Sequence, residues 1–424
     1  MQAIIMAAGQ STRTHPLTLT RPKPLLKVAN KPILEHQLDA LSGLVDEAVL
    51  IVWYRKDMIE HHFGASYNGM PIKYVYQTEQ LGTGHAILQC KDVVTGPFIA
   101  MNGDDLYDGA DLSRLATVPQ GALAKHVDDP RMYGIYEVTD DGFAKRIVEK
   151  PADVFSNLAN AGVYKFQPEI FDILAETPKS ERGEIEITSA VQVLAERGSF
   201  RVIEMNGFWL PIGYPWHLLS ANEYWLENFL AHEILGEVSP HAHINGRVYV
   251  AKDAIVRSGA VIDGPAYIGA GASIGPNCFI RPCTTIGNHC KVGHSVEIKN
   301  SILFDRAAVP HLSYVGDSVI GERANLGAGT ITANFRHDGK NIAATVKGVR
   351  VDSGRRKFGA IIGDDVHTGI NTSIYPGRML YPHTVTFPGE AIRKDVPRCA
   401  ARRNPDCAFT NKLSYWMLRP TWAM

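Results

Sequence analysis

Two architectures are predicted within one chain: an α/β half built on a mostly parallel sheet, followed by a parallel β-helix. Over residues 1–230, short apolar runs alternate with helical patterns, which is typical of a parallel sheet with helices on both faces. From residue 250 onward, β-branched aliphatic residues recur at every sixth position, which is typical of a parallel β-helix. An amphipathic stretch at 215–233 predicts a helix between the two patterns.

The first half contains four apolar runs that we expect to be buried strands, at 2–7, 47–53, 72–77 and 97–102. Helical patterns lie between them, as at 32–45. Open α/β sheets bind ligands beyond the carboxyl ends of their strands. The segments that follow the first and the fourth run are therefore candidate sites.

The loop after the first run, residues 6–24, is rich in small and basic residues. It combines glycine, serine and threonine with Arg13 and Lys23, and it contains no carboxylate. Backbone N–H groups in a small-residue loop, together with a forked arginine and a lysine, suit a phosphate chain. The same composition also suits an ordinary polar turn, so the loop alone does not decide its function.

The second half is defined by its six-residue repeat. We expect each segment to form one flat side of a coil, with three sides to a coil and coils about 4.8 Å apart. The pattern slips near residue 303 and is interrupted between 335 and 361. The aliphatic positions are Val250, Val256, Ile262, Ile268, Ile274, Ile280, Ile286, Val292 and Ile298, and the mostly small positions are Ala254, Ala260, Ala266, Ala272, Cys278, Thr284, Cys290 and Val296.

Composition excludes several classes of protein. The chain has 424 residues, a formal net charge of −1 and no apolar run as long as a membrane span. We therefore expect neither nucleic acid nor a membrane as a partner. Six cysteines in so long a chain do not form a disulfide framework, and their spacing matches no zinc pattern. We expect a cytoplasmic protein without a targeting segment, in which Cys278 and Cys290 are small packing residues.

Segments in both halves match one known family in the same order. Together they resemble the two-domain sugar-1-phosphate nucleotidylyltransferase/acetyltransferases of archaeal type, which form UDP-N-acetylglucosamine. The segments are MAAGQSTR at 6–13, QTEQLGTGHA at 77–86, NGDD at 102–105, YGIYEV at 133–138, IVEKP at 147–151, NAGVY at 160–164, VPHLSYVGDSVIG at 309–321 and ANLGAGTITANF at 324–335.

The resemblance covers residue 1 to about residue 397 and implies a domain organisation. A nucleotidyltransferase domain with a Rossmann-like, mostly parallel sheet would occupy 1–230, and 231–247 would be a linker. A left-handed parallel β-helix of hexapeptide repeats would form the acetyltransferase domain at 248–397. The C-terminal tail at 398–424 lies outside the resemblance.

The resemblance also implies a nucleotidyl-transfer site. Arg13 and Lys23 would neutralise the triphosphate of UTP or dTTP, and Asp104 would hold Mg²⁺. The nucleotide would be bound by Ala7, Ala8, Gly9, Gln77, Gln80, Gly82 and Thr83, and the sugar phosphate by Gly134, Glu149, Lys150 and Asn160.

This chain departs from the family pattern at two positions. Ser11 replaces the usual glycine of the phosphate loop, which implies strain if its φ is positive. Pro211 replaces the aspartate of a Trp-x-Asp-x-Gly segment that usually provides the second magnesium ligand. Asp105 is adjacent to Asp104, but successive side chains at a strand end diverge. We therefore expect nucleotidyl transfer to be weak or to need unusually high magnesium.

The acetyl-transfer site implied by the resemblance lies in the repeat region. His311 would be the general base on the 2-amino group, and acetyl-CoA would be the co-substrate. Arg281 and Lys299 would bind the sugar phosphate, and the Ala328 N–H would donate to the oxyanion. Tyr314, Asn325, Asn334 and Lys340 would complete the site. The family packs three β-helices side by side, which implies a homotrimer or a multiple of it.

Four interpretations follow. The first is a bifunctional enzyme that acetylates glucosamine 1-phosphate and couples the product to UTP. The second is an acetyltransferase with a weakened first domain, which Pro211 favours. The third is a glucose-1-phosphate thymidylyl- or uridylyltransferase with a regulatory β-helix, and the fourth is a non-catalytic regulatory subunit. The sequence does not distinguish UTP from dTTP, or glucosamine from galactosamine. The insertion at 335–361 suits a cover for acetyl-CoA or for a neighbouring subunit. Its basic residues Arg355, Arg356 and Lys357 suit either coenzyme A phosphates or a solvated basic face.

Overall fold

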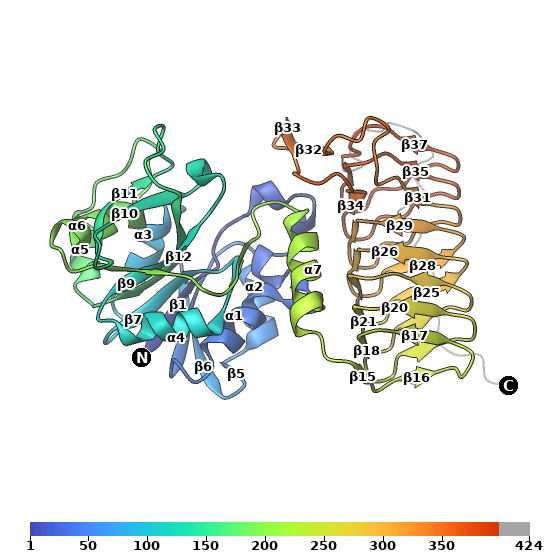
Figure 1. Cartoon of the computed structure of the whole chain (residues 1–424), viewed down its shortest axis with the longest axis horizontal. Coiled ribbons are helices and arrows are strands. Elements are labelled where there is room, and N and C mark those ends of the chain that lie inside the picture. The colour runs from blue at the N-terminus through green and yellow to red at the C-terminus, as the bar shows by residue number, and fades with distance from the viewer. Residues whose placement is uncertain (398–424) are drawn as a thin grey trace.

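The computed structural model describes residues 1–397, so the predicted tail lies outside the described residues. Figure 1 shows two bodies side by side, a sheet with helices and a tall coil, with one helix standing between them. That helix is α7 (His217–Phe229), which corresponds to the amphipathic stretch predicted at 215–233.

The first body is built on a ten-stranded sheet whose centre is parallel. The order is β11-β10-β12-β7-β1-β4-β6-β5, with β9 beside β12 and β13 beside β9. The four predicted strands, β1 (Gln2–Met6), β4 (Glu47–Val52), β6 (Met70–Tyr76) and β7 (Phe98–Asn102), form its parallel centre. The other strands are β5 (Ser66–Tyr67), β9 (Gly121–His126), β10 (Gly134–Val138), β11 (Ala144–Glu149), β12 (Leu158–Phe166) and β13 (Arg201–Glu204).

The sheet is mixed, whereas the sequence predicts a mostly parallel one. Strand β12 runs antiparallel to β7, β9 and β10, and β10 and β11 form an antiparallel pair. The residues between β10 and β11 are too few for a crossover helix, so a short turn joins these strands and they must be antiparallel.

Helices cover both faces of this sheet because its central strands are apolar on both sides. Ile4 of β1 packs with α3, α5 and α6, while its neighbour Ile5 packs with α1, α2 and α4. The helices are α1 (Ile33–Leu41), α2 (Lys56–Phe63), α3 (Thr83–Leu88), α4 (Gly109–Thr117), α5 (Ile170–Glu176) and α6 (Ile187–Glu196). Two-strand ribbons are formed by β2 (Lys27–Val28) with β3 (Lys31–Pro32), and by β8 (Asp105–Tyr107) with β14 (Trp209–Pro211).

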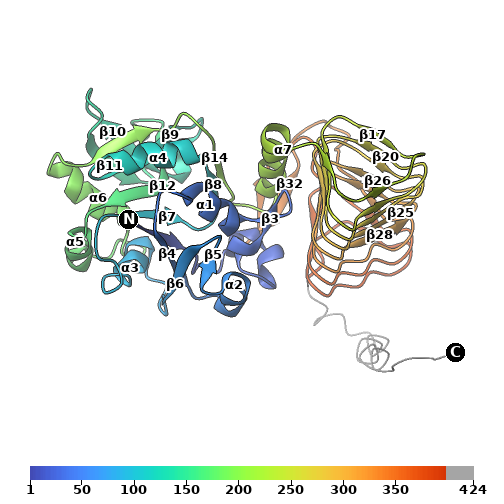
Figure 2. The ribbon, with the colours of Figure 1, turned by 90° about the horizontal axis from the view of Figure 1, so that it is seen from below.

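The second body is a coil of three parallel sheets. Val250 pairs with Ile268 and Ile268 with Ile286, so strands align after three six-residue segments. This pairing is consistent with the predicted parallel β-helix, and Figure 2 shows the stacked turns from below. The sheet nearest α7 contains β15 (Glu233–Ile234), β18 (Val248–Val250), β21 (Ala266–Ile268), β24 (Thr284–Ile286), β27 (Ile302–Leu303), β30 (Val319–Ile320), β34 (Ala360–Ile362) and β36 (Arg378–Leu380).

The other two sheets complete each turn, and the coil begins within the segment predicted as a linker. The second sheet contains β16 (Glu237–Val238), β19 (Ile255–Val256), β22 (Ser273–Ile274), β25 (Lys291–His294) and β28 (Ala308–His311). The third contains β17 (His243–Asn245), β20 (Val261–Asp263), β23 (Phe279–Ile280), β26 (Glu297–Lys299), β29 (Tyr314–Gly316), β31 (Ile331–Thr332), β35 (Ser373–Ile374) and β37 (Ala391–Ile392).

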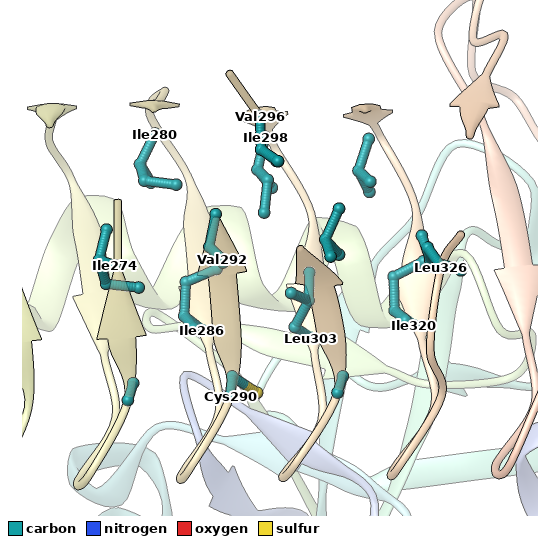
Figure 3. Packing of buried hydrophobic residues seen from close by; sticks show 14 of the residues in the cluster. Ile274, Ile280, Ile286, Cys290, Val292, Val296, Ile298, Leu303, Ile320 and Leu326 are labelled. Atoms are coloured by element: carbon teal, nitrogen blue, oxygen red, sulfur yellow. The ribbon is translucent and has the colours of Figure 1, made fainter. Parts of the chain in front are cut away.

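The repeat residues form the core of the coil. Figure 3 shows Ile274, Ile280 and Ile286 pointing inward from successive sides, and their side chains are fully buried. Burying one such side chain stabilises the fold by about 1.5–3 kcal/mol. Cys278 and Cys290 occupy small positions of the same core, as the sequence predicts. Burial raises the pKa of both thiols to about 12, which keeps them protonated.

Helix α7 joins the two bodies through an apolar cluster and a polar centre. Leu218 and Trp216 pack in one cluster with Phe304 of the coil. Asn222 of α7 accepts a hydrogen bond from the Thr285 hydroxyl at 2.7 Å, and its amide donates to the carbonyl oxygen of Cys283 at 3.0 Å. Because these bonds are buried between the bodies, they fix the position of α7 on the coil.

The insertion in the repeat folds back toward the first body. It contains the antiparallel hairpin β32 (Ala343–Val346) and β33 (Val349–Asp352). Ile342 and Phe358 pack with Trp216 beside α7. Arg355 donates a hydrogen bond to the Ser220 hydroxyl at 2.8 Å and forms an ion pair with Glu223. Arg355 is therefore engaged within its own chain and is not part of a solvated basic face.

Candidate functional site

A pocket of about 440 Å³ lies at the carboxyl end of the parallel strands, where the sequence predicts a site. We call it the strand-end pocket. It brings together residues from four segments that are separated in the sequence. Its lining includes Ala7, Ala8, Gly9, Ser11, Arg13, Gln77, Gln80, Gly82, Thr83, Asn102, Asp104 and Glu184. Glu184 was not predicted, since nothing in its local sequence indicates that it reaches this pocket.

The loop below this pocket is held by its own side chains. It contains three short 3₁₀ turns, at Thr12–Thr14, Leu17–Leu19 and Lys23–Leu25. The Ser11 carbonyl accepts hydrogen bonds from the hydroxyls of Thr14 and Thr18, at 2.7 and 2.9 Å. Ser11 has a φ of 49°, so the strain predicted for a non-glycine residue at this position is present.

The 9–24 loop is also anchored to the coil. Arg21 donates to Asp364 at 2.5 Å and to Glu322 at 2.8 Å, and all these contacts cross between the two bodies. The Thr20 hydroxyl donates to the same Asp364 carboxylate at 2.7 Å. The coil therefore holds the loop that carries Arg13 and Lys23.

Lys23 and Asp104 meet at the edge of the strand-end pocket. The Lys23 ammonium lies 2.7 Å from the Asp104 carboxylate, and the lysine side chain is only 3% exposed whereas that of Asp104 is 38% exposed. Arg13 lies beside Tyr214, with its guanidinium carbon 5.6 Å from the ring centroid. Two cations and one accessible carboxylate thus surround the small-residue loop.

Asp105 points away from the pocket and holds strand β14. It accepts hydrogen bonds from the Trp209 indole at 3.2 Å and from the Ile212 backbone N–H at 3.1 Å. Burial, and then the nearby Asp104 charge, raise the pKa of Asp105 to about 7. Pro211 lies directly opposite Asp105 in the β8–β14 pair and has no side-chain oxygen. Asp105 therefore does not replace the missing carboxylate.

The far side of the pocket depends on a close backbone contact. Gly82 has a φ of 101°, and a Cβ there would lie 2.7 Å from the Ile185 carbonyl oxygen, so only glycine fits. The Gly84 N–H donates to this same oxygen at 2.8 Å. The buried Gln77 amide donates to the Gly82 carbonyl at 3.2 Å, which fixes the turn before helix α3.

The four residues predicted to bind a sugar phosphate lie on neighbouring strands. Gly134 pairs with Glu149 across β10 and β11, and Asn160 lies on the adjacent β12. Burial is the main cause that raises the pKa of Glu149. Arg182, which the sequence analysis missed, lies 3.7 Å from Glu149, and Lys150 lies 3.5 Å from it.

On the coil, five side chains gather on the outer face of the β23–β26–β29 sheet. We call this group the coil face, and it consists of Arg281, Glu297, Lys299, Tyr314 and Asn334. Arg281 pairs with Glu297 at 2.8 Å, and the Asn334 amide donates to the Tyr314 hydroxyl at 3.1 Å. Glu297 was missed by the sequence analysis, although it lies close to Lys299 in sequence and on the same side of the strand.

His311 lies away from the coil face, in a groove of the same chain. It ends β28 beside His294 and lines a groove of about 830 Å³, which we call the side groove. Within residues 1–397, no side-chain hydrogen bond or ion pair joins His311 to the coil face. Asn325 forms parallel β-bridges with Ala308 and His367, on the side of the coil that carries the side groove.

The two remaining predicted residues also lie apart from the coil face. The Ala328 carbonyl accepts from the Asn371 N–H at 2.7 Å. Lys340 lies in the insertion, where its backbone N–H donates to Asp338 at 3.2 Å. One chain therefore places the predicted acetyl-site residues in several groups and does not enclose them in one pocket.

Other classes of site are restricted by the structure. None of the helices in residues 1–397 combines the length and apolar character that a membrane span requires. The same residues contain no cluster of three or more histidine, cysteine, aspartate or glutamate side chains that could hold a metal ion. A magnesium ion at Asp104 would therefore take most of its ligands from a nucleotide and water, which magnesium accepts readily.

Comparison with known proteins gives matches to both halves. A family model described as nucleotidyl transferase matches residues 2–228, and one described as GMPPB C-terminal domain matches residues 262–386. The bifunctional protein GlmU of Methanococcus maripaludis is 41% identical over 398 residues, covering 93% of this chain and 95% of that protein. A bifunctional sugar-1-phosphate nucleotidylyltransferase/acetyltransferase of Sulfurisphaera tokodaii is 39% identical over 401 residues, covering 93% and 98%.

Proposed function

Because this chain belongs to the family of bifunctional sugar-1-phosphate nucleotidylyltransferase/acetyltransferases, we propose that it forms UDP-N-acetylglucosamine in two steps. It acetylates glucosamine 1-phosphate with acetyl-CoA, and it couples N-acetylglucosamine 1-phosphate to UTP with release of pyrophosphate. The observation that carries this proposal is the similarity over both halves to relatives named for both activities, together with the strand-end pocket and the coil face.

The strand-end pocket is proposed as the nucleotidyl-transfer site. A phosphate oxygen of the sugar phosphate attacks the α-phosphate of UTP, and pyrophosphate leaves in line. Arg13 and Lys23 neutralise the triphosphate, and the 7–9 backbone lies against it. Gln77 and Gln80 are proposed to bind the base, and Gly82 and Thr83 would let the base come close to the backbone. Asp104 is the residue that would hold Mg²⁺, which neutralises phosphate charge when bound.

The sugar phosphate is proposed to lie against β10, β11 and β12. Glu149 would accept hydrogen bonds from sugar hydroxyls, and Lys150 would bind the phosphate. Gly134 leaves room beside Asn160, because a Cβ at Gly134 would approach the Glu149 carboxylate to 3.0 Å. Arg182 beside Glu149 adds a second cation to this region.

The coil is proposed as the acetyl-transfer domain. The 2-amino nitrogen attacks the thioester carbonyl of acetyl-CoA, His311 takes the proton from that nitrogen, and coenzyme A leaves as the thiolate. Arg281 and Lys299 bind the sugar phosphate, while Tyr314, Asn325, Asn334 and Lys340 position the amine and the sugar. The Ala328 N–H is the proposed donor to the oxyanion.

A trimer of left-handed coils is proposed to bring these groups together. Leu312 and Ile370 are large apolar residues that are 62% and 54% exposed. Leu312 directly follows His311, and the Ile370 turn stacks above Ala328 through the Asn371 bond. Apolar side chains at this edge suit burial against a neighbouring coil. We further propose that the nucleotidyltransferase domain ends at residue 230 and the acetyltransferase domain at residue 397, and that the protein has a cytoplasmic location.

One alternative is favoured by a specific residue. Pro211 provides no carboxylate to share a metal ion with Asp104, and this favours an acetyltransferase with weakened nucleotidyl transfer. The retained Arg13, Lys23 and Gly82 support the bifunctional proposal, because a pocket without function needs none of them.

The test is product formation by the full chain. It is incubated with glucosamine 1-phosphate, acetyl-CoA, UTP and a range of magnesium concentrations, and thiol and pyrophosphate are measured separately. We expect both to be released and UDP-N-acetylglucosamine to form. Thiol release without pyrophosphate at any magnesium concentration would support the alternative, and release of neither would contradict the proposal. Parallel reactions with dTTP and galactosamine 1-phosphate establish the preferred substrates.

A further inference from the structure

A continuous series of polar contacts leads from helix α7 to the coil face. We call it the α7 network, and its members are Glu223, Arg355, Asn300 and Asp317. Glu223 of α7 pairs with Arg355 of the insertion, and the same carboxylate accepts from the Asn300 amide at 2.5 Å. The Asn300 amide also donates to Asp317 at 2.9 Å. In Figures 1 and 2, α7 stands beside the coil along the sheet that begins with β15 and β18.

Asp317 is the member that reaches two residues of the coil face. One of its carboxylate oxygens accepts from the Asn334 amide at 2.5 Å and lies 3.4 Å from the Lys299 ammonium. Its backbone N–H also bonds to the Lys299 carbonyl at 2.9 Å, so the aspartate stacks one coil above the lysine. Both Asp317 oxygens therefore have donors, and the side chain acts on Lys299 and Asn334.

Burial makes these contacts energetically significant. The Asp317 side chain is 2% exposed, and a carboxylate removed from water requires charged or polar partners. Lys299 and Arg355 provide two positive charges for the negative charges of Asp317 and Glu223. Because the network is balanced in charge, loss of the Glu223 charge leaves Arg355 and Asn300 without their shared partner.

The network fixes two groups that would otherwise rotate. A lysine side chain samples many rotamers, and Asp317 restricts Lys299 by holding its ammonium group. The Asn334 amide uses its two N–H groups on Tyr314 and Asp317, which leaves its oxygen available to a ligand. The orientation of the phosphate-binding lysine and of an acceptor oxygen is thus set from the side of α7.

We propose that Glu223 and Asp317 are positioning residues for acetyl transfer, which hold Lys299 and Asn334 in place for the amino-sugar phosphate. This inference rests on the proposed function of the coil face. It makes acetyl transfer dependent on α7, a helix that precedes the coil, and on residues outside the proposed acetyl-transfer site.

The test uses the full-length chain and acetyl-transfer kinetics with both substrates varied. Glu223→Gln and Asp317→Asn are expected to raise the KM for glucosamine 1-phosphate by about tenfold or more, as loss of residues that orient ligand groups typically does. The KM for acetyl-CoA and the rate of pyrophosphate release are expected to stay unchanged. Glu223→Asp, which keeps the charge, is expected to recover part of the loss.

Lys27→Gln is the matched control. Lys27 pairs with Asp305 at 2.7 Å across the same junction between the two bodies. Its side chain is about as exposed as that of Arg355, but it lies outside the α7 network. This variant is expected to keep both activities and both KM values. Thermal melting of each variant shows whether the fold is retained, and Glu223, on a more exposed site than Asp317, keeps the test valid if Asp317→Asn does not fold.

The outcomes separate this inference from the proposed function. If the unmodified chain releases no thiol from acetyl-CoA, the proposed function fails. If it does release thiol, and folded Glu223→Gln keeps the KM for glucosamine 1-phosphate, the inference is overturned. A rise in both KM values by the same factor would also overturn it, because that result reflects general loss of structure.

Discussion

The strand-end pocket and the coil face are built in opposite ways. The pocket is a hollow of about 440 Å³ whose walls come from strand ends, loops and helix α3 at one edge of one sheet. The coil face is an outer side of a coil whose members contact each other, with His311 around the corner in the side groove. An open sheet provides a crevice at its strand ends, whereas a coil provides flat sides. The first site can thus be complete within one chain, whereas in the proposed trimer a neighbouring coil would complete the second.

The junction between the bodies serves the two sites differently. The coil holds the 9–24 loop through Arg21, and α7 reaches the coil face through Glu223. Each body thus supports a site on the other. We therefore expect changes within one site to affect one activity, and changes at the junction to affect stability as well.

The largest difference between the sites is expected for Lys23→Met. This change removes a buried positive charge from the strand-end pocket and leaves Asp104 without its partner. The rate of pyrophosphate release should fall by about 10²–10³, as for other groups that stabilise charge in a transition state. Thiol release should be unchanged. Equal losses in the two initial rates would mean that the sites are not independent.

Arg21→Met is expected to affect the junction and the pocket together. Removing one partner of a buried ion pair costs about 3–5 kcal/mol, since Asp364 would keep a buried charge. Urea unfolding measures this loss, and pyrophosphate release should fall more than thiol release because the loop loses its anchor. In a double-mutant cycle, Asp364→Asn should lower the free energy of unfolding less in the Arg21→Met variant than in the unmodified chain. Full additivity would show that the pair does not couple the bodies.

Pro211→Asp is expected to strengthen magnesium binding at the strand-end pocket. A carboxylate at this position adds an oxygen ligand beside Asp104, and metal affinity rises with the number of charged ligands. The magnesium concentration for half-maximal pyrophosphate release should fall by about tenfold. Pro211→Ala removes the proline without adding oxygen and should show no such shift. If the aspartate variant behaves like the alanine variant, the missing carboxylate does not limit the reaction.

The smallest expected difference between the two bodies is in how their stability changes in acid. Burial is the main cause that lowers the pKa of His36 and His217 to about 4 and also lowers that of His15. His15 and His36 lie in the first body, and His217 begins α7. In the unfolded chain these groups bind protons from about pH 6.5 downward, whereas the folded chain keeps His36 and His217 neutral until about pH 4. Their contribution to stability is therefore present above pH 6.5 and decreases as pH falls toward 4.

Hydrogen exchange at pH 7 and pH 4.5 measures this effect in each region. Amides of β1 and β4 should lose more protection in acid than amides of the coil. His36→Gln, which keeps a donor for the Val28 carbonyl, should reduce the acid effect in the first body. Earlier loss of protection in the coil would contradict this assignment.

The features predicted from the sequence are those with a regular or local signal. Ile274 and Ile280 were predictable as core residues because every sixth position in a coil has the same surroundings. The strand-end pocket was predictable because parallel strands bring their ends to one edge. The positive φ of Ser11 agrees with the expectation of strain for a residue that replaces glycine.

The remaining features depend on contacts between distant residues. The Glu223–Asn300 hydrogen bond joins a helix to a coil turn, and neither residue has a pattern that indicates the other. Arg355 belongs to a basic run, which alone does not distinguish a solvated face from a buried ion pair. The antiparallel direction of β12 comes from its pairing with β7 and β9, which lie far from it in the sequence, and its apolar pattern suits either direction.

The central claim is that one chain carries two separate active sites. Pyrophosphate release from UTP and thiol release from acetyl-CoA, measured on Asp104→Ala and His311→Ala, test it most directly. We expect Asp104→Ala to lose pyrophosphate release and keep thiol release, and His311→Ala to do the reverse. If either variant loses both activities while its melting temperature is unchanged, or if either retains both, the claim is contradicted.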